Sequence, residues 1–283
     1  MNKVKIFTDS TNDLSPEIIK KLDIEVFPLY VNFGEESYKD GVNITVSELY
    51  KEVEKRGVLP KTAAISIGEL VELFQKYIDD GYDIVYTGIS RQMSRTFENA
   101  LFAAKEVDEN RIFVVDSMNL STGIGLLLLK ACKDRDMGLS AKEIAANIEK
   151  NSKLVLSQFA IETMEFLHKG GRCSGITRFV GTLLRIKPII AVRDGKMSVM
   201  KKPIGKMKVA LDAMIKQIIL DKERLDTNHI LITHSVADES CEYIKSKLEV
   251  EFPGVDIICT SAGCVISSHC GKGTIGILYM VKE

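Results

Sequence analysis

Short apolar runs alternate with amphipathic segments through the first half of the chain. Three of these runs, at residues 4–7, 83–90 and 111–117, are rich in β-branched and aromatic side chains and predict buried strands. Segments with helical spacing separate them. Because this alternation is typical of βα units, the first half is predicted to form a largely parallel sheet with flanking helices.

Four helix starts are marked by their own capping residues. In a capping box, a Ser or Thr hydroxyl accepts from a backbone amide of the first turn, and a Glu three residues later reaches back. Three such boxes, and one serine followed by proline, predict four helices. The pairs are Thr45 with Glu48, Ser66 with Glu69, Ser140 with Glu143, and Ser15 with Pro16. A further helix is expected from about Ser94.

The pattern changes from about residue 154. Asp194-Gly195 stands between two apolar runs, which predicts a β-hairpin. The strands predicted in this half are residues 189–193, 196–200, 229–233, 255–260 and 275–280. Hairpins combined with fewer βα units predict a mixed or antiparallel sheet.

The chain is therefore predicted to be an α/β protein of two closely packed domains, residues 1–153 and 154–283. Its 283 residues fit two domains of ordinary size, and 45% of them are hydrophobic. Lys and Arg number 38 against 39 Asp and Glu, a net charge of −1. Such a balance argues against a protein that coats nucleic acid or anionic lipid.

Cysteine content and the apolar runs indicate a reduced, cytoplasmic chain. The six cysteines include no CxxC pair and are too sparse for a disulfide scaffold. The N-terminus reaches Asp9 before a signal-like apolar run develops. The apolar run at residues 124–129 is too short to span a bilayer, so no membrane insertion is expected.

Three cofactor motifs are considered, and none is expected to be used. Residues 271–276 match G-x-G-x-x-G but precede a strand pattern instead of a helix. Cys264, His269 and Cys270 do not have the spacing of a zinc site. Asp9 and Asp13 could bind Mg²⁺, although an aspartate in such a turn more often accepts from neighbouring backbone amides.

A hydroxyl-rich loop, residues 90–96, follows the second predicted strand. Its position between a strand and a helix resembles a nucleophile elbow, except that Gln92 replaces the second glycine. Helix capping is the ordinary role of Ser90 and Ser94 in such a place. The alternative is a serine-dependent esterase or acyl hydrolase that uses Ser90 or Ser94 with His269, which we place in a glycine-bracketed loop.

Two basic features point to ligands or partners. Arg172 follows two glycines in a polar loop, residues 167–174, and can be presented to a ligand or across a domain interface. Five lysines and no acidic residue lie between residues 196 and 208. This strip, with Lys201 and Lys202 at its centre, is either a solvated face or a docking surface for an acidic partner, as in a regulatory protein.

Taken together, the motifs resemble the DegV family of bacterial fatty-acid-binding proteins over essentially the whole chain. Each motif is weak alone, but the ordered set is specific. The set comprises residues 9–14, Tyr38 to Gly41, Leu59 to Thr62 followed by Ser66, residues 90–96, Asp116-Ser117, Gly170 to Ser174, Lys187-Pro188, Asp194-Gly195 and His269 to Gly273.

The resemblance implies a non-catalytic acyl carrier with a long-chain fatty acid, such as palmitate, buried between two α/β domains. It places the fatty-acid carboxylate at Thr62, Ser94 and His269, with Arg172 nearby. It also implies two partners, a fatty acid kinase that phosphorylates the bound carboxylate and an acyltransferase of phospholipid synthesis. No metal or cofactor beyond the fatty-acid ligand is implied.

The chain departs from the family pattern at a few positions. Arg91 and Arg95 stand where the family usually has serine and glycine, so the carboxylate loop is expected to be more basic. Ile204 stands where relatives that dock the kinase often carry arginine.

Overall fold

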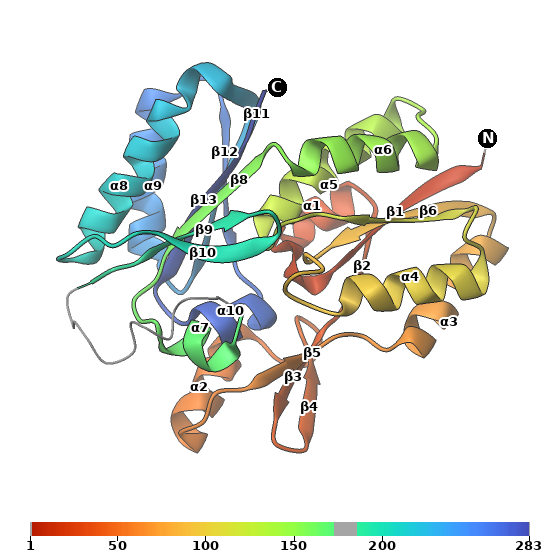
Figure 1. The fold of residues 1–283 in the computed structure, drawn as a ribbon, viewed down its shortest axis with the longest axis horizontal. Coiled ribbons are helices and arrows are strands. Elements are labelled where there is room, and N and C mark those ends of the chain that lie inside the picture. The colour runs from red at the N-terminus through yellow and green to blue at the C-terminus, as the bar shows by residue number, and fades with distance from the viewer. Residues whose placement is uncertain (1, 173–185, 283) are drawn as a thin grey trace.

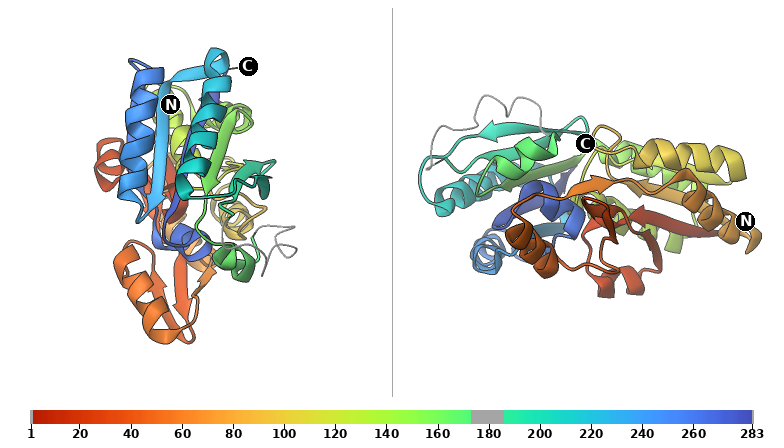
Figure 2. Two further views of the ribbon diagram at one scale, coloured as in Figure 1. Left: turned by 90° about the vertical axis from the view of Figure 1, so that its left-hand side faces the viewer. Right: turned by 90° about the horizontal axis from the view of Figure 1, so that it is seen from below.

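The computed structural model describes residues 2–172 and 186–282. Two large sheets lie side by side with helix α5 (Thr122–Asp136) between them, and a small third sheet lies at one end of the molecule (Figure 1). The left-hand view of Figure 2 shows the same small sheet, with helix α2 (Val46–Arg56), projecting below the rest of the chain.

The first large sheet is entirely parallel, as predicted, with strand order β2-β1-β6-β7. Its strands are β1 (Lys3–Asp9), β2 (Ile24–Phe27), β6 (Tyr82–Gly88) and β7 (Ile112–Asp116). Ile6 pairs with Ile24 on one side and Val85 on the other, and all three side chains are buried. The segments that follow β2, β6 and β7 supply residues to the site described below.

The predicted capping signals are confirmed. All three capping boxes form both of their hydrogen bonds, and Ser15 caps a helix with proline in its first turn. The helix expected near Ser94 begins two residues later. The helices are α1 (Pro16–Lys21), α2 (Val46–Arg56), α3 (Ile67–Asp79), α4 (Thr96–Val107) and α6 (Ala141–Ser152).

The second large sheet is mixed, also as predicted, with order β10-β9-β8-β13-β11-β12. Only β11 and β12 pair in parallel. Its strands are β8 (Val155–Ala160), β9 (Ile189–Arg193), β10 (Lys196–Lys201), β11 (Leu225–Ser235), β12 (Asp256–Ser261) and β13 (Thr274–Val281). Helices α8 (Met207–Leu220) and α9 (Asp238–Glu251) cover its outer face (Figure 1).

Helix α5 (Thr122–Asp136) contains the apolar run 124–129 and contacts both large sheets. Ile124, Leu127 and Leu128 are fully buried in it. A helix enclosed by two sheets needs apolar residues on nearly every side. Burial in the protein core therefore explains the apolar run of α5. The division into domains 1–153 and 154–283 stays a prediction, since α5 packs against strands on either side of that boundary.

The small sheet was not predicted. It is antiparallel, with order β4-β3-β5, and consists of β3 (Tyr30–Phe33), β4 (Glu36–Lys39) and β5 (Lys61–Ala63). Two short helices from the second half of the chain, α7 (Glu165–Gly170) and α10 (Cys264–Cys270), pack against each other. Helix α10 also contacts β3, β5 and α2 of the first half.

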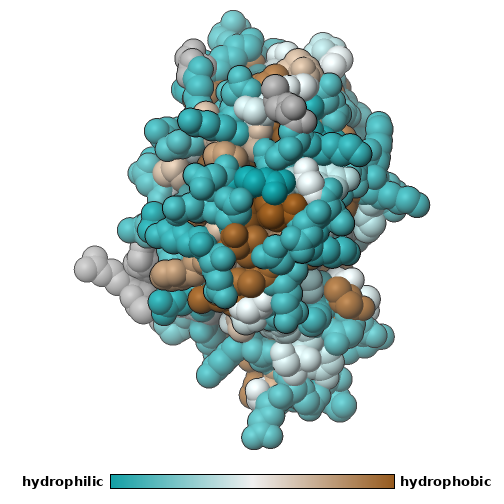
Figure 3. Space-filling view, turned by 90° about the vertical axis from the view of Figure 1, so that its right-hand side faces the viewer, coloured by the Kyte–Doolittle hydropathy of each residue, from teal (hydrophilic) through white to brown (hydrophobic). Residues whose placement is uncertain are grey.

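The face seen in Figure 3 is mostly hydrophilic, with its main apolar area near the centre. Across residues 2–172 and 186–282, no helix has both the length and the apolar composition needed to cross a bilayer.

Candidate ligand-binding site

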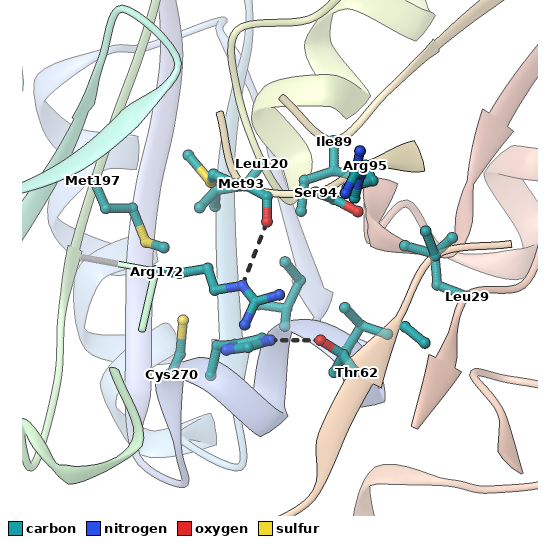
Figure 4. Close-up of a pocket in the computed structure, with 15 residues that line it drawn as sticks. Leu29, Thr62, Ile89, Met93, Ser94, Arg95, Leu120, Arg172, Met197 and Cys270 are labelled. Atoms are coloured by element: carbon teal, nitrogen blue, oxygen red, sulfur yellow. Dashed lines mark hydrogen bonds between the residues drawn. The ribbon is translucent and has the colours of Figure 1, made fainter. Parts of the chain in front are cut away.

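A cavity of about 250 Å³ lies where loops of the parallel sheet, the small sheet, β10 and α10 converge (Figure 4). Its wall is largely apolar, with a small number of polar side chains, which is the usual character of a small-molecule site. The apolar lining is Leu29, Ala63, Ala64, Ile89, Met93, Leu120, Met197, Val265, Ile266 and Cys270, and the polar lining is Thr62, Ser94, Arg95, Arg172 and His269.

Thr62 and His269 form a hydrogen-bonded pair in this cavity. Thr62 Oγ1 lies 2.8 Å from His269 Nε2, although the two residues are 207 positions apart (Figure 4). Thr62 comes from β5, and His269 from the last turn of α10. The prediction that His269 lies in a loop was therefore wrong, because residues 264–270 form a helix, and the glycines with positive φ, Gly271 and Gly273, come only after it.

His269 is held as a neutral imidazole. Burial, and to a smaller extent the positive charge of Arg172, lowers the pKa of His269 from 6.5 to about 4. Its Nδ1 atom is buried and has no hydrogen-bond partner among the described residues. With Nε2–H donating to Thr62, the bare Nδ1 remains an acceptor and the Thr62 hydroxyl proton is available to a third group in the cavity.

Gly170 makes room for this imidazole. A Cβ atom at residue 170 would lie 2.3 Å from His269 Nδ1, so the end of α7 can pack on the ring only without a side chain. The segment that contains Gly170 was predicted as a loop. It is instead the helix α7 up to that residue, while Cys173 and Ser174 of the same motif lie outside the described residues.

Ser94 lines the same cavity from a different element. Its Oγ lies 2.9 Å from Thr96 Oγ1 and accepts from the Thr96 amide at 3.3 Å, at the start of α4. In the view of Figure 4, Ser94 and Arg95 lie on one side of the cavity and Thr62 on the other. Ser94 is half-buried, so its hydroxyl can turn toward a ligand between the two walls.

Arg172 connects the two sides of the cavity. Its Nε donates to the Met93 carbonyl at 3.4 Å, and its Nη1 donates to the Gly170 carbonyl at 2.7 Å. The side chain is otherwise exposed; it lines the cavity, and its positive charge acts on His269. Four predicted residues, Thr62, Ser94, His269 and Arg172, are thus brought to one cavity.

The lysine strip lies elsewhere. Lys201 Nζ donates to Gln217 Oε1 of α8 at 3.3 Å, and Lys202 is exposed just beyond β10. Neither lines the cavity. Ile204 is also strongly exposed on this side of the molecule. Of the two unexpected arginines, Arg95 lines the cavity, whereas Arg91 pairs with Glu98 at 3.6 Å.

The arrangement does not support the serine hydrolase alternative. Ser90 is fully buried, and its Oγ accepts from the Gln92 amide at 3.2 Å. Within the described part of the chain, neither Ser90 nor Ser94 is hydrogen-bonded to His269, whose Nε2 contacts Thr62 instead. A general base has to reach the hydroxyl that it activates, and here the imidazole faces a threonine.

The residues considered for metal binding have other partners. Cys264 Sγ contacts the Ile44 carbonyl at 3.5 Å. Asp9 accepts from the Thr11 amide, as expected, and also from Ile89 N at 2.9 Å. Among the residues that the structure describes, no group of three His, Cys, Asp or Glu side chains is placed to hold a metal ion.

The apolar lining was not predicted, because it comes one or two residues at a time from many elements. Leu29, Leu120 and Met197 are examples, from three distant parts of the chain. No local pattern separates such a residue from an ordinary core residue. Only polar members of the lining were predicted to contact the ligand.

Comparison with known proteins shows one family over the whole chain. Residues 3–282 match the family model described as "Uncharacterised protein, DegV family". A DegV domain-containing protein of Clostridium acetobutylicum is 35% identical over 282 residues, with 100% of both chains covered.

Two similar solved structures share the whole fold. One, described as fatty acid binding of a DegV family protein from Thermus thermophilus, is 28% identical with a TM-score of 0.90 and covers 99% of this chain and 100% of that one. The other, described as DegV, a fatty acid binding protein from Bacillus subtilis, is 28% identical with a TM-score of 0.87 over 100% of both chains. The chain thus belongs to the DegV family.

Proposed function

We propose that this protein binds a long-chain fatty acid, with the carboxylate at Thr62, Ser94 and His269 and the acyl chain in the apolar part of the cavity. The observation that carries the proposal is the Thr62–His269 pair at the wall of a largely apolar cavity. The fatty-acid binding named for the Thermus thermophilus and Bacillus subtilis relatives supports the same ligand class.

The acyl chain supplies most of the attraction. A C16 acid has about fifteen methylene or methyl groups, and their burial contributes about 12 kcal/mol before the costs of binding are subtracted. A second, smaller cavity shares Leu120, Ile266 and Cys270 with the first. Because they share these residues, the two cavities are adjacent. The tail is proposed to pass from the first cavity into the second, toward β13 and β8.

The carboxylate needs donors because burying an unpaired charge is costly. Two hydroxyl groups donate without adding charge, and the Thr62 hydroxyl is oriented by His269 Nε2. Arg172, exposed at the cavity, adds a cation on the solvent side. This arrangement holds the carboxylate while leaving it accessible, which is what a carrier of fatty acids requires.

Lipid analysis of the purified protein tests the binding. The protein is denatured and extracted, and the extract is examined by mass spectrometry for fatty acids. We expect a long-chain fatty acid near one equivalent, or uptake of added palmitate by protein stripped of lipid. If no fatty acid is found and the stripped protein takes up no palmitate, the proposal is wrong.

We further propose that the protein is a cytoplasmic acyl carrier and not an enzyme. In this role a partner kinase phosphorylates the bound carboxylate, and an acyltransferase of phospholipid synthesis takes the acyl group. The exposed Lys202 and neighbouring Lys201 are the proposed partner-facing residues.

A reconstituted reaction tests the carrier role. Palmitate-loaded protein is mixed with a bacterial fatty acid kinase and Mg-ATP, and acyl phosphate is trapped with hydroxylamine. We expect acyl hydroxamate only when all three are present, and less of it with the Lys201→Gln/Lys202→Gln double variant. Equal product without this protein would reject the carrier role.

A further inference from the structure

Helix α10, which contains His269, has an unusual beginning. Its N-cap residue is Gly263, which has no side chain to accept from the first amides of the helix. The acceptors are instead two buried carboxyl groups from the first half of the chain, Asp40 and Asp13.

Asp40 makes the larger contribution. Its Oδ1 accepts from Cys264 N at 2.7 Å, and its Oδ2 accepts from Val265 N at 3.2 Å and from Ser10 Oγ at 3.0 Å. Both carboxyl oxygens are therefore used by amides of α10.

Asp13 holds the preceding residue. Its Oδ1 accepts from Gly263 N at 2.8 Å, and its Oδ2 accepts from Ser121 Oγ at 2.5 Å. Gly263 also permits the close approach, because a Cβ there would lie 3.1 Å from Asp40 Oδ2 and 3.4 Å from Asp13 Oδ1.

The small sheet thus holds α10 at both ends. Asp40 directly follows β4 and holds the first turn, whereas Thr62 in β5 contacts His269 in the last turn. Strands β4 and β5 both pair with β3. Any shift of α10 along its axis would lengthen the amide contacts at one end and the Thr62 contact at the other.

We propose that Asp40 and Asp13 are positioning residues, which fix α10 and so hold His269 Nε2 against Thr62 for recognition of the ligand carboxylate. The part of the inference that concerns ligand binding rests on the proposed function. Its geometric part, the placement of His269, is independent of any ligand.

The first test follows the imidazole itself. The His269 ring is observed by NMR during a pH titration and assigned with a His269→Gln variant. In Asp40→Ala we expect the His269 pKa to rise from about 4 toward its ordinary value of 6.5, because the released ring gains water. Arg172 is the charged group beside the ring, so an Arg172→Gln background separates its effect from burial.

Substitution by asparagine is expected to have different effects at the two aspartates. Asp40→Asn turns an amide NH₂ toward one of the two backbone donors, so it is expected to shift His269 in the same direction as Asp40→Ala. It keeps the side-chain volume, so the test does not depend on Asp40→Ala folding. Asparagine at residue 13 can still accept from Gly263 and donate to Ser121, so Asp13→Asn is expected to restore most of what Asp13→Ala loses.

Palmitate affinity, measured on stripped protein, is the second readout. We expect Asp40→Ala and Asp40→Asn to bind about tenfold more weakly than the unaltered protein. Ser140→Ala is the matched control, since it removes a cap from α6, which does not line the cavity. An unchanged His269 titration in both Asp40 variants would overturn the inference. If the unaltered protein binds no palmitate but His269 shifts as expected, the proposed function fails and the positioning role stands.

Discussion

The chemistry of the cavity depends on a few polar side chains, of which Thr62 is the most direct to test. Thr62→Val keeps the shape of the side chain and removes the hydroxyl that faces His269. We expect palmitate affinity to fall about tenfold with little change in the free energy of unfolding, because one donor to a charged group is lost. Isothermal titration on stripped protein measures the affinity.

Thr227→Val is the control for this change, since Thr227 is exposed in β11 and does not line the cavity. Equal affinities of the Thr62 and Thr227 variants would show that the Thr62 hydroxyl is not a carboxylate donor.

A second prediction concerns the room that Gly170 leaves for the His269 ring. In Gly170→Ala the added Cβ would lie 2.3 Å from His269 Nδ1, so the imidazole has to move. We expect weaker palmitate binding and a changed His269 titration by NMR. Gly68→Ala in α3 is matched, because a Cβ there meets nothing within 4 Å. That variant is expected to be as stable as the unaltered protein or up to about 1 kcal/mol more stable.

Asp13 gives a prediction about pH. Burial raises the pKa of Asp13 from 3.8 to about 8, so the folded protein keeps a proton that the unfolded chain releases. The stability contribution of this proton is complete below pH 3.8 and is lost as the pH rises to about 8. The free energy of unfolding of the unaltered protein, relative to Asp13→Asn, is thus expected to fall across this range by a few kcal/mol.

Urea denaturation of both proteins at pH steps from 4 to 8 measures that difference. A difference that stays constant over the range would contradict a buried, proton-binding Asp13.

At the scale of elements, the helices and strands that could be predicted are those marked by residues close together in the sequence. Helices α2, α3 and α6 each begin at a capping box that closes within four residues. Helix α10 was missed because its cap acceptors are 224 and 250 positions away, and Gly263 gives no sign of them. The same distance explains why His269 was assigned to a loop, although its role at the cavity was expected.

The small sheet was missed for a different reason. Its strands have only three or four residues, too few to show a period, although Gly34 with a positive φ opens a two-residue turn between β3 and β4. That glycine was the signal available for the hairpin. Thr62 was identified only through the family motif, since nothing in Lys61–Ala63 itself indicates a strand that faces a cavity.

Helix α5 offers a prediction at the same scale. Leu127 is fully buried between the two large sheets, so Leu127→Ala is expected to lower the free energy of unfolding by about 2–5 kcal/mol. Leu220→Ala, at an exposed position of α8, should change it by less than about 0.5 kcal/mol. Circular dichroism and tyrosine fluorescence in urea both report the change. Similar effects of the two substitutions would contradict the central role of α5.

At the scale of the molecule, the cavity joins segments from both halves of the chain. Thr62 and Ser94 come from the first half, and Met197 and His269 from the second. A bound fatty acid is therefore expected to stabilise the whole fold, by about 2.7 kcal/mol at a free concentration 100 times Kd. Hydrogen exchange should slow in β5, in residues 89–95 and in α10 together. Protection of only one half would place the ligand elsewhere.

The position of α5 also determines what would happen if the chain were cut after residue 153 into two fragments. The cut would divide the sequence but not the apolar surface, because α5 stays with the first fragment while β8, β11 and β13 go with the second. One fragment would expose a row of leucines, and the other a bare sheet face. Each fragment alone would be prone to aggregate, whereas co-expression would let the two reassemble through α5.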